Sequence, residues 1–229
     1  MKIVIIHGQN HKGSTYHIAR MLAEKIKGDI KEFFLPRDFG EFCVGCTKCF
    51  MESEKKCPHY EKLRPLTDAM DEADVIILAS PVYVYHVTGA MKTFLDHYGY
   101  RWMVHRPKES MFRKQGVCIS TAAGAGMKQT NKDMADSLFF WGVAKRYQYG
   151  VRVAAVNWNG VSEKKKCAID KATSGIAKKI VNNSKHVKPG IKTRAMFWAM
   201  HFTQRKGFNP CDAEYWKSKG WTGKKRPWK

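Results

Sequence analysis

The N-terminal stretch of the chain, residues 2–15, constrains the fold more than any other. Residues 3–6 are four consecutive β-branched residues, a run typical of a strand buried on both faces near the centre of a parallel sheet. The run gives way at Gly8 to a polar loop with a second glycine, and a helical pattern of apolar residues begins after Thr15. The stretch therefore predicts a strand, a tight loop and the N-terminus of a helix.

The polar loop is suited to binding a phosphate group, because backbone N–H groups and the positive end of the helix dipole converge where such a loop enters a helix. Its spacing excludes two common nucleotide motifs. Ser14 stands where the G-x-x-x-x-G-K-[ST] loop has its lysine, and no G-x-G-x-x-G is present. The alternative is an ordinary turn between a strand and a helix. Side chains that can add hydrogen bonds to a phosphate are Gln9, His11, Ser14 and Thr15.

Apolar runs alternate with helical patterns along the chain up to about residue 185. This alternation predicts an α/β fold, a doubly wound parallel sheet of five strands covered by helices. Residues 186–229 differ in composition, with 11 lysines and arginines, two acidic residues and several aromatic residues. We therefore expect two units, a domain over residues 1–185 and a basic, aromatic C-terminal extension over residues 186–229. The five predicted strands cover residues 3–6, 29–35, 74–79, 116–121 and 149–156.

Three loops are expected to meet at one edge of this sheet. In open parallel sheets the ligand lies beyond the carboxyl ends of the strands, and the first, third and fourth strands end at Gly8, Ser80 and Thr121. The first loop offers phosphate donors, the second offers flat apolar surfaces at Pro81 and Tyr83, and the third offers small residues that let a planar ring approach the main chain. A phosphate at one end and an aromatic plane at the other is the outline of FMN.

The segment Ser80–Tyr83, with the sequence SPVY, resembles the S-P-x-Y loop of the NAD(P)H-dependent FMN reductases and related flavodoxin-like oxidoreductases. The loop from Gly8 to Thr15 is similar to the phosphate loop of this family. The family loop contains a proline and an arginine that this chain lacks. His11, Lys12 and backbone groups would therefore compensate the negative charge of the phosphate. The resemblance covers roughly residues 1–184 and implies a flavodoxin-like fold.

The resemblance also implies an activity. The chain would hold FMN noncovalently, take hydride from NADH or NADPH, and reduce a quinone, a flavin or another acceptor. No catalytic acid or base is expected, because hydride transfer to a flavin does not require one. Packing beneath the following helix is the alternative role for Tyr83. The residues that the resemblance assigns to FMN are Gln9, His11, Gly13, Ser14, Thr15, Pro81, Val82, Tyr83, Val84, Thr121, Ala122, Gly124 and Gly126.

Four of the seven cysteines lie close together with the spacing C-x2-C-x2-C-x7-C: Cys43, Cys46, Cys49 and Cys57. This clustering favours a metal or cluster site in a reducing compartment over a disulfide framework. The last cysteine precedes a proline, as the fourth does in bacterial ferredoxins, and the spacing suits a 4Fe–4S cluster. Zinc, with His59 in place of one cysteine, and free thiols are the alternatives.

The cysteine run resembles the cluster segment of the iron-sulfur flavoproteins, which share the flavodoxin-like fold. This resemblance implies an alternative function, an electron carrier in which FMN and a 4Fe–4S cluster receive electrons from a reduced ferredoxin. The net charge of +21 would then steer the acidic surface of that partner toward the protein.

The strongly basic composition also raises the question of nucleic acid or membrane partners. No RNP-type, zinc-finger or helix-turn-helix pattern accompanies the charge, so nucleic-acid binding is not expected. No apolar run approaches 18 residues and no leader precedes the first strand, which indicates a cytoplasmic protein. The family usually forms dimers or tetramers, so we expect a homodimer or homotetramer with the aromatic extension at the contact. The basic stretch around Arg101, His105 and Arg106 is expected to be a solvated loop.

Overall fold

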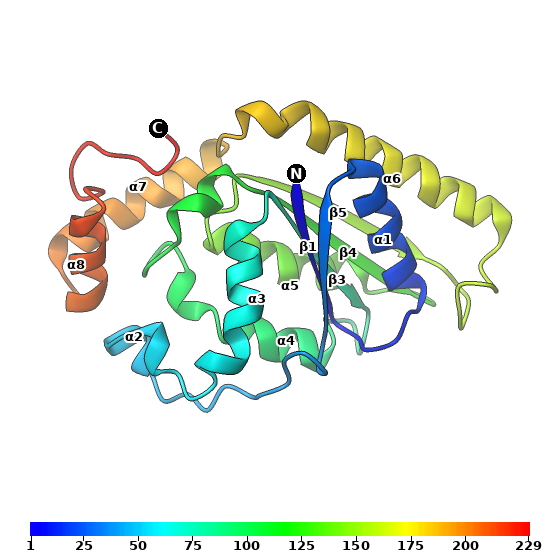
Figure 1. Ribbon diagram of the computed structural model, residues 1–229, viewed down its shortest axis with the longest axis horizontal. Helices are drawn as coiled ribbons and strands as arrows, with labels where there is room; N and C mark the ends of the chain where they lie inside the picture. Colours follow the sequence, from blue (N-terminus) through cyan, green and yellow to red (C-terminus); the bar gives the residue numbers. More distant parts are fainter.

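The computed structural model describes residues 1–229, and it shows a parallel sheet of five strands in the order β2-β1-β3-β4-β5 (Figure 1). This order, with helical connections between the strands, is the flavodoxin-like form of the doubly wound fold, so the predicted fold class is confirmed. The β-branched run of residues 3–6 lies in the central region of the sheet, hydrogen-bonded on both sides. The strands are β1 Lys2–His7, β2 Asp29–Phe34, β3 Val75–Pro81, β4 Gln115–Ala122 and β5 Lys145–Arg152.

Helices cover both faces of the sheet because successive residues of β1 point to opposite sides. Ile3 and Ile5 pack with α1 and α6 on one face, and Val4 and Ile6 pack with α3, α4 and α5 on the other (Figure 1). The core is thus divided into two apolar layers separated by the sheet. The helices are α1 Ser14–Ile26, α3 Tyr60–Glu72, α4 Gly89–Asp96, α5 Met127–Phe140 and α6 Glu163–Asn183.

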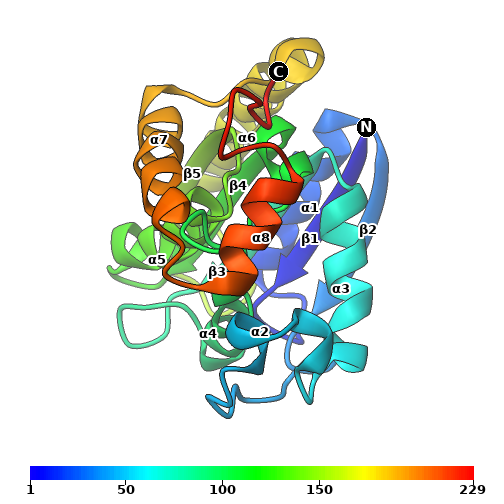
Figure 2. The ribbon, with the colours of Figure 1, turned by 90° about the vertical axis from the view of Figure 1, so that its left-hand side faces the viewer.

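The C-terminal extension forms two helices, α7 Ile191–Lys206 and α8 Pro210–Ser218. The start of α8 is typical of a helix, with Asn209 before it and Pro210 as its first residue. The Asn209 side chain caps the amides of Cys211 and Asp212, and proline is favoured at the first helical position. Figure 2 shows α8 beside the short helix α2 Lys48–Met51.

A third apolar cluster joins the extension to the rest of the chain. Phe197 of α7, Trp216 of α8 and Trp221 are buried against Met103 and Phe112, which precede β4. Aromatic rings contribute large buried areas, so this cluster anchors the extension on the side of the molecule shown in Figure 2.

Two sequence predictions are wrong in this part of the structure. The fifth strand begins and ends four residues earlier than expected, at Lys145 and Arg152, and the apolar residues after it form a loop. The arginines expected in a solvated loop are buried in ion pairs: Arg101 with Asp71, and Arg106 with Asp212. A buried guanidinium is stable only when a carboxylate compensates its charge. No helix in the structure is long and apolar enough to cross a membrane.

Candidate functional site

A cleft opens at the edge of the sheet where the strands end. Its cavity volume is about 180 Å³, and about 700 Å³ when the open space at its mouth is included. The loops after β1, β3 and β4 border it together, as the sequence predicted. Ten of the thirteen residues assigned to FMN line this cleft: Gln9, His11, Gly13, Ser14, Thr15, Pro81, Val82, Tyr83, Thr121 and Ala122.

The N-terminus of α1 forms one end of the cleft. No side chain caps this helix, and its first turn contains no acidic residue, so the amide groups of the first turn have no partner within the helix. The imidazole of His11 lies over Gly13, where a Cβ would be 2.9 Å from its Nε2. Free amides and the helix dipole favour an anion at this position.

Hydroxyl groups lock the three loops together. The hydroxyls of Thr15 and Thr121 lie 2.6 Å apart in a buried position and join the start of α1 to the end of β4. The Thr88 hydroxyl donates to the carbonyl of Gly8 at 2.6 Å, and the Thr88 amide donates to Ser80 Oγ at 3.0 Å. These bonds hold the cleft in a fixed shape before any ligand enters.

A strained hairpin forms the opposite wall. The backbone groups of Tyr83 and His86 exchange two hydrogen bonds of 3.0 Å, and the two residues between them have positive φ angles, 48° at Val84 and 66° at Tyr85. Such a turn usually contains asparagine and glycine, and a β-branched residue at positive φ is strained. The side chain of Tyr83 accepts a hydrogen bond from Gln9, which ties the hairpin to the phosphate loop.

Three predicted residues lie outside the lining of the cleft. Val84 is at the tip of the hairpin with 92% of its surface exposed, and Gly124 and Gly126 lie in the loop between β4 and α5. Gly126 has φ 98°, and a Cβ there would lie 2.6 Å from Val82. Glycine at position 126 therefore lets this loop pack against the hairpin, which is a role in shaping the cleft wall.

The cleft floor contains a histidine that the sequence did not single out. His7, the last residue of β1, is buried, and its Nε2 lies 2.9 Å from a carboxylate oxygen of Glu32. Burial lowers the pKa of His7, and the hydrogen bond to Glu32 opposes this shift. The residue is therefore a neutral, fixed part of the floor at neutral pH, and its position at the end of the first strand was the signal for it.

The loop after β5 is a fourth border of the cleft, formed by Val153, Ala155 and Val156. It was missed because the fifth strand was predicted to continue to residue 156. Since β5 pairs with β4, its carboxyl end reaches the same edge of the sheet, and the rule that predicted the other three loops applies to it as well.

The cleft combines the two kinds of surface that FMN requires. The uncapped start of α1 and the polar side chains around it suit a phosphate, and Pro81, Val82 and Tyr83 offer an apolar wall for a flat ring. Ala122 and Ala123 leave the main chain of the β4 loop accessible. The residues present therefore fit FMN, with no charged group that would oppose a phosphate.

The cysteine segment lies at the same edge of the sheet, on the side of α3 and α4. Cys43 and Cys46 are exposed, whereas Cys49 and Cys57 are partly buried. Burial raises the pKa of Cys49 to about 11, and the charges of the other three thiols add to this shift. The assignment of all four cysteines to a 4Fe–4S cluster stays a prediction.

The C-terminal extension holds the helix that carries Cys49. The carbonyl of Phe50 accepts hydrogen bonds from Arg106 at 3.2 Å and from Asn209 at 3.1 Å. Cys211 Sγ donates to the carbonyl of Met51 at 2.9 Å. Since these bonds satisfy the open carbonyl groups at the end of α2, they fix a helix that has only one turn.

The comparison of the sequence with protein-family models decides the family. Residues 1–154 match the model described as NADPH-dependent FMN reductase. The chain belongs to this family. The matched residues include all five strands and the three loops that the sequence predicted to meet.

Curated relatives of this FMN reductase family member carry two kinds of name. An iron-sulfur flavoprotein from Archaeoglobus fulgidus is 39% identical over 88 residues, which are 37% of this chain and 36% of the relative. An NADPH azoreductase from a Bacillus species is 30% identical over 130 residues, 55% of this chain and 61% of the relative. The matched region thus spans less than two thirds of the length of these relatives.

Solved structures share the fold at low sequence identity. A flavone reductase superposes with a TM-score of 0.60 at 16% identity, covering 83% of this chain and 66% of the other. An FMN-dependent NADH-azoreductase from Bacillus anthracis, solved in complex with FMN, superposes with a TM-score of 0.55 at 12% identity, covering 77% of this chain and all of the other. These similarities agree with the flavodoxin-like sheet order.

Proposed function

We propose that this FMN reductase family member is an oxidoreductase that binds FMN in the cleft and uses NAD(P)H to reduce a quinone, a flavin or another small acceptor. Bound FMN would supply the redox chemistry by accepting hydride at N5 and passing electrons on. The observation that carries the proposal is the convergence of an uncapped helix N-terminus and an apolar hairpin in one cleft.

The chain's own contribution is to bind and orient the cofactor. The first turn of α1, with Ser14 and Thr15, would hold the phosphate through backbone amides and hydroxyls. The hairpin at Tyr83 and the loop after Thr121 would hold the ring between them. The hydrogen bonds among these loops keep the distance between the phosphate end and the ring end of the cleft fixed.

The substitution Ser14→Asp tests the phosphate end without weakening the helix. A carboxylate in the first turn stabilises the helix through the dipole, but it would lie about 4 Å from a bound phosphate and repel it by roughly 4 kcal/mol at an effective dielectric constant of 20. We expect FMN binding, measured by fluorescence titration, to weaken at least tenfold while riboflavin binding stays the same. The matched control is Ser162→Asp, because Ser162 caps α6 and does not line the cleft.

Activity is tested by adding NADPH or NADH anaerobically to protein loaded with FMN. Bleaching of the flavin absorption band, faster than for free FMN, is the expected result. Protein that fails to retain FMN, or FMN that stays oxidised, would contradict the proposal.

A second candidate function is the iron-sulfur electron carrier, because the cysteine segment has the spacing C-x2-C-x2-C-x7-C and a relative named iron-sulfur flavoprotein matches part of the chain. In this case a reduced ferredoxin would be the partner and the basic surface would steer it. Iron and acid-labile sulfide in anaerobically prepared protein, both lost in Cys46→Ser, would support this function. Absence of both would leave the FMN enzyme as the function.

We also propose that the protein is cytoplasmic, since exposed thiols persist in reducing compartments, and that it forms a homodimer or homotetramer. Exposed aromatic residues on the extension support the second point: Phe202 is 57% and Phe208 80% exposed. The division into a domain of residues 1–185 and an extension of residues 186–229 is likewise a proposal. Its support is the change in composition after residue 185, where basic and aromatic residues predominate.

A further inference from the structure

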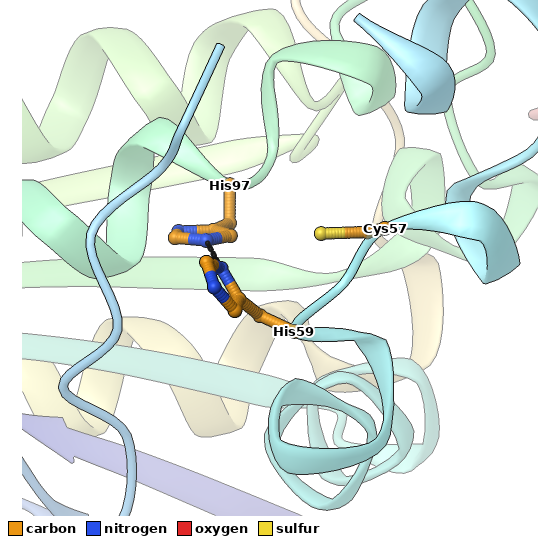
Figure 3. Close-up of side chains that lie close together, drawn as sticks. All are labelled: Cys57, His59 and His97. Atoms are coloured by element: carbon orange, nitrogen blue, oxygen red, sulfur yellow. Dashed lines mark hydrogen bonds between the residues drawn. The ribbon is translucent and has the colours of Figure 1, made fainter. Parts of the chain in front are cut away.

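Three side chains with metal-binding atoms meet on the α3 and α4 side of the sheet: Cys57, His59 and His97. The sulfur and one nitrogen of each ring lie within 4.8 Å of one another. Figure 3 shows the two rings facing each other, with the sulfur of Cys57 directed toward them. Cys57 and His59 lie just before α3, and His97 directly follows α4, so the packing of these two helices brings the group together.

The orientation of both rings suits a metal ion. Nδ1 of His97 donates a hydrogen bond of 2.8 Å to the carbonyl of Thr93, which leaves a lone pair on Nε2. That atom lies 3.0 Å from Nδ1 of His59. Metal-binding histidines typically donate their other N–H to a carbonyl or carboxylate in this way. One proton now bridges the two nitrogens, and a cation could take its place.

We propose that Cys57, His59 and His97 bind one zinc ion. One thiolate and two imidazoles are ligands that zinc prefers, whereas magnesium and calcium require oxygen ligands. The other cysteines of the segment do not belong to this three-residue group, which leaves the fourth position of a tetrahedral ion open to water. Protein zinc sites with three ligands and one open position are typically catalytic.

The surroundings support a cation at this place. His97 is buried, and the edge of the Phe39 ring packs against it at 4.8 Å between ring centres. The carboxylate of Glu41 lies close enough for both imidazoles to lower its pKa, although its ion pair with Lys62 is the larger cause. Glu41 is thus a nearby anion whose charge is already paired with Lys62.

The zinc site and the predicted 4Fe–4S cluster exclude each other, because both require Cys57. They make opposite demands on the remaining residues. The cluster needs Cys46 and no histidine, and the zinc site needs both histidines and none of Cys43, Cys46 or Cys49. The zinc proposal does not depend on flavin binding. Its only link to the cleft is α4, which begins at Thr88 beside Gly8 and, with eight residues, spans about 12 Å to His97.

The experiment uses the full chain after removal of metal by a chelator. Zinc content is measured by mass spectrometry, and cobalt(II) is titrated as a coloured substitute. We expect one metal ion per chain and a thiolate-to-cobalt absorption band. Cys57→Ser should remove the band, and Cys167→Ser, which changes an exposed cysteine on α6, should leave it unchanged.

The decisive variant is His59→Asn. His59 occupies the N-cap position of α3, and asparagine is a favoured N-cap residue, so this variant should fold. Metal affinity should fall at least tenfold. The control His186→Asn changes an exposed histidine and should have no effect. Thermal unfolding of each variant without metal shows whether the fold is intact.

Three outcomes would overturn the proposal. One is the absence of stoichiometric cobalt or zinc binding to the full chain. The second is unchanged affinity in His59→Asn. The third is loss of metal in Cys46→Ser with retention in His59→Asn, which would identify the four-cysteine cluster as the metal site.

Discussion

The strained hairpin at the mouth of the cleft gives a prediction whose size follows from the structure. Val84 has φ 48° and is 92% exposed. The left-handed conformation costs an ordinary L-residue roughly 1–2 kcal/mol, whereas asparagine tolerates it. Since almost none of the Val84 surface is buried, its replacement loses little packing. We therefore expect Val84→Asn to raise the free energy of unfolding by about 1 kcal/mol.

For a chain of this length, 1 kcal/mol corresponds to a rise in Tm of about 2–4 °C. Thermal and urea unfolding of the protein without FMN measure it. The matched control is Val156→Asn, which makes the same exchange at a residue that is also fully exposed but has no positive φ. The control should change Tm by less than about 1 °C, since surface substitutions usually stay within about 0.5 kcal/mol. If Val84→Asn does not exceed the control, the argument from backbone strain is refuted.

The same variant tests the predicted contact between Val84 and the flavin. If its two methyl groups cover the bound ring, their loss removes about 0.8 kcal/mol each, and the Kd for FMN should rise roughly tenfold. An unchanged Kd would exclude Val84 from the FMN site and leave the strain argument intact. Greater stability together with weaker FMN binding would show that the chain keeps a strained turn because the cofactor needs it.

Four further predictions concern other parts of the molecule. Thr121→Val leaves the buried Thr15 hydroxyl without a partner and should lower the free energy of unfolding, measured in urea, by about 1–3 kcal/mol. The double variant Thr15→Val/Thr121→Val should regain part of this loss. A single variant as stable as the wild type would contradict the role of this hydroxyl pair. Burial lowers the pKa of His7 below 6.5, so the unfolded chain binds more protons near that pH and stability falls as pH drops. His7→Gln should show a flatter dependence of unfolding free energy between about pH 7 and pH 5, and equal slopes would count against it. Asp212 is 1% exposed and lies between an arginine and a histidine. Asp212→Ala should lower the free energy of unfolding by about 3–5 kcal/mol, and the cysteine segment of this variant should react faster with a thiol reagent. Phe202→Glu should shift the oligomer toward monomer in size-exclusion chromatography, and an unchanged elution volume would place the subunit contact elsewhere.

Much of the fold could be predicted because its signals are local. A β-branched run followed by glycine and a helical pattern specifies a buried strand and its turn, and the second and fourth strands lie within one residue of their predicted bounds. The sequence also predicted that three loops meet, because parallel strands place their carboxyl ends at one edge of the sheet. The edge strand β5 was misplaced because it has no apolar run and none of its residues is fully buried; partly buried and exposed residues alternate over residues 147–152.

The sequence by itself determined the alternation of strands and helices, the edge at which the cofactor site lies, and the family. Only the tertiary structure decided that Arg106 is buried against Asp212, that His7 forms the floor of the cleft, and that His97 meets Cys57. The physical reason is distance along the chain. Periodicity and turn chemistry act within a few residues, whereas an ion pair or a group of metal-binding side chains forms when separate helices pack on the same face of the sheet, and no local pattern encodes which of their side chains will meet.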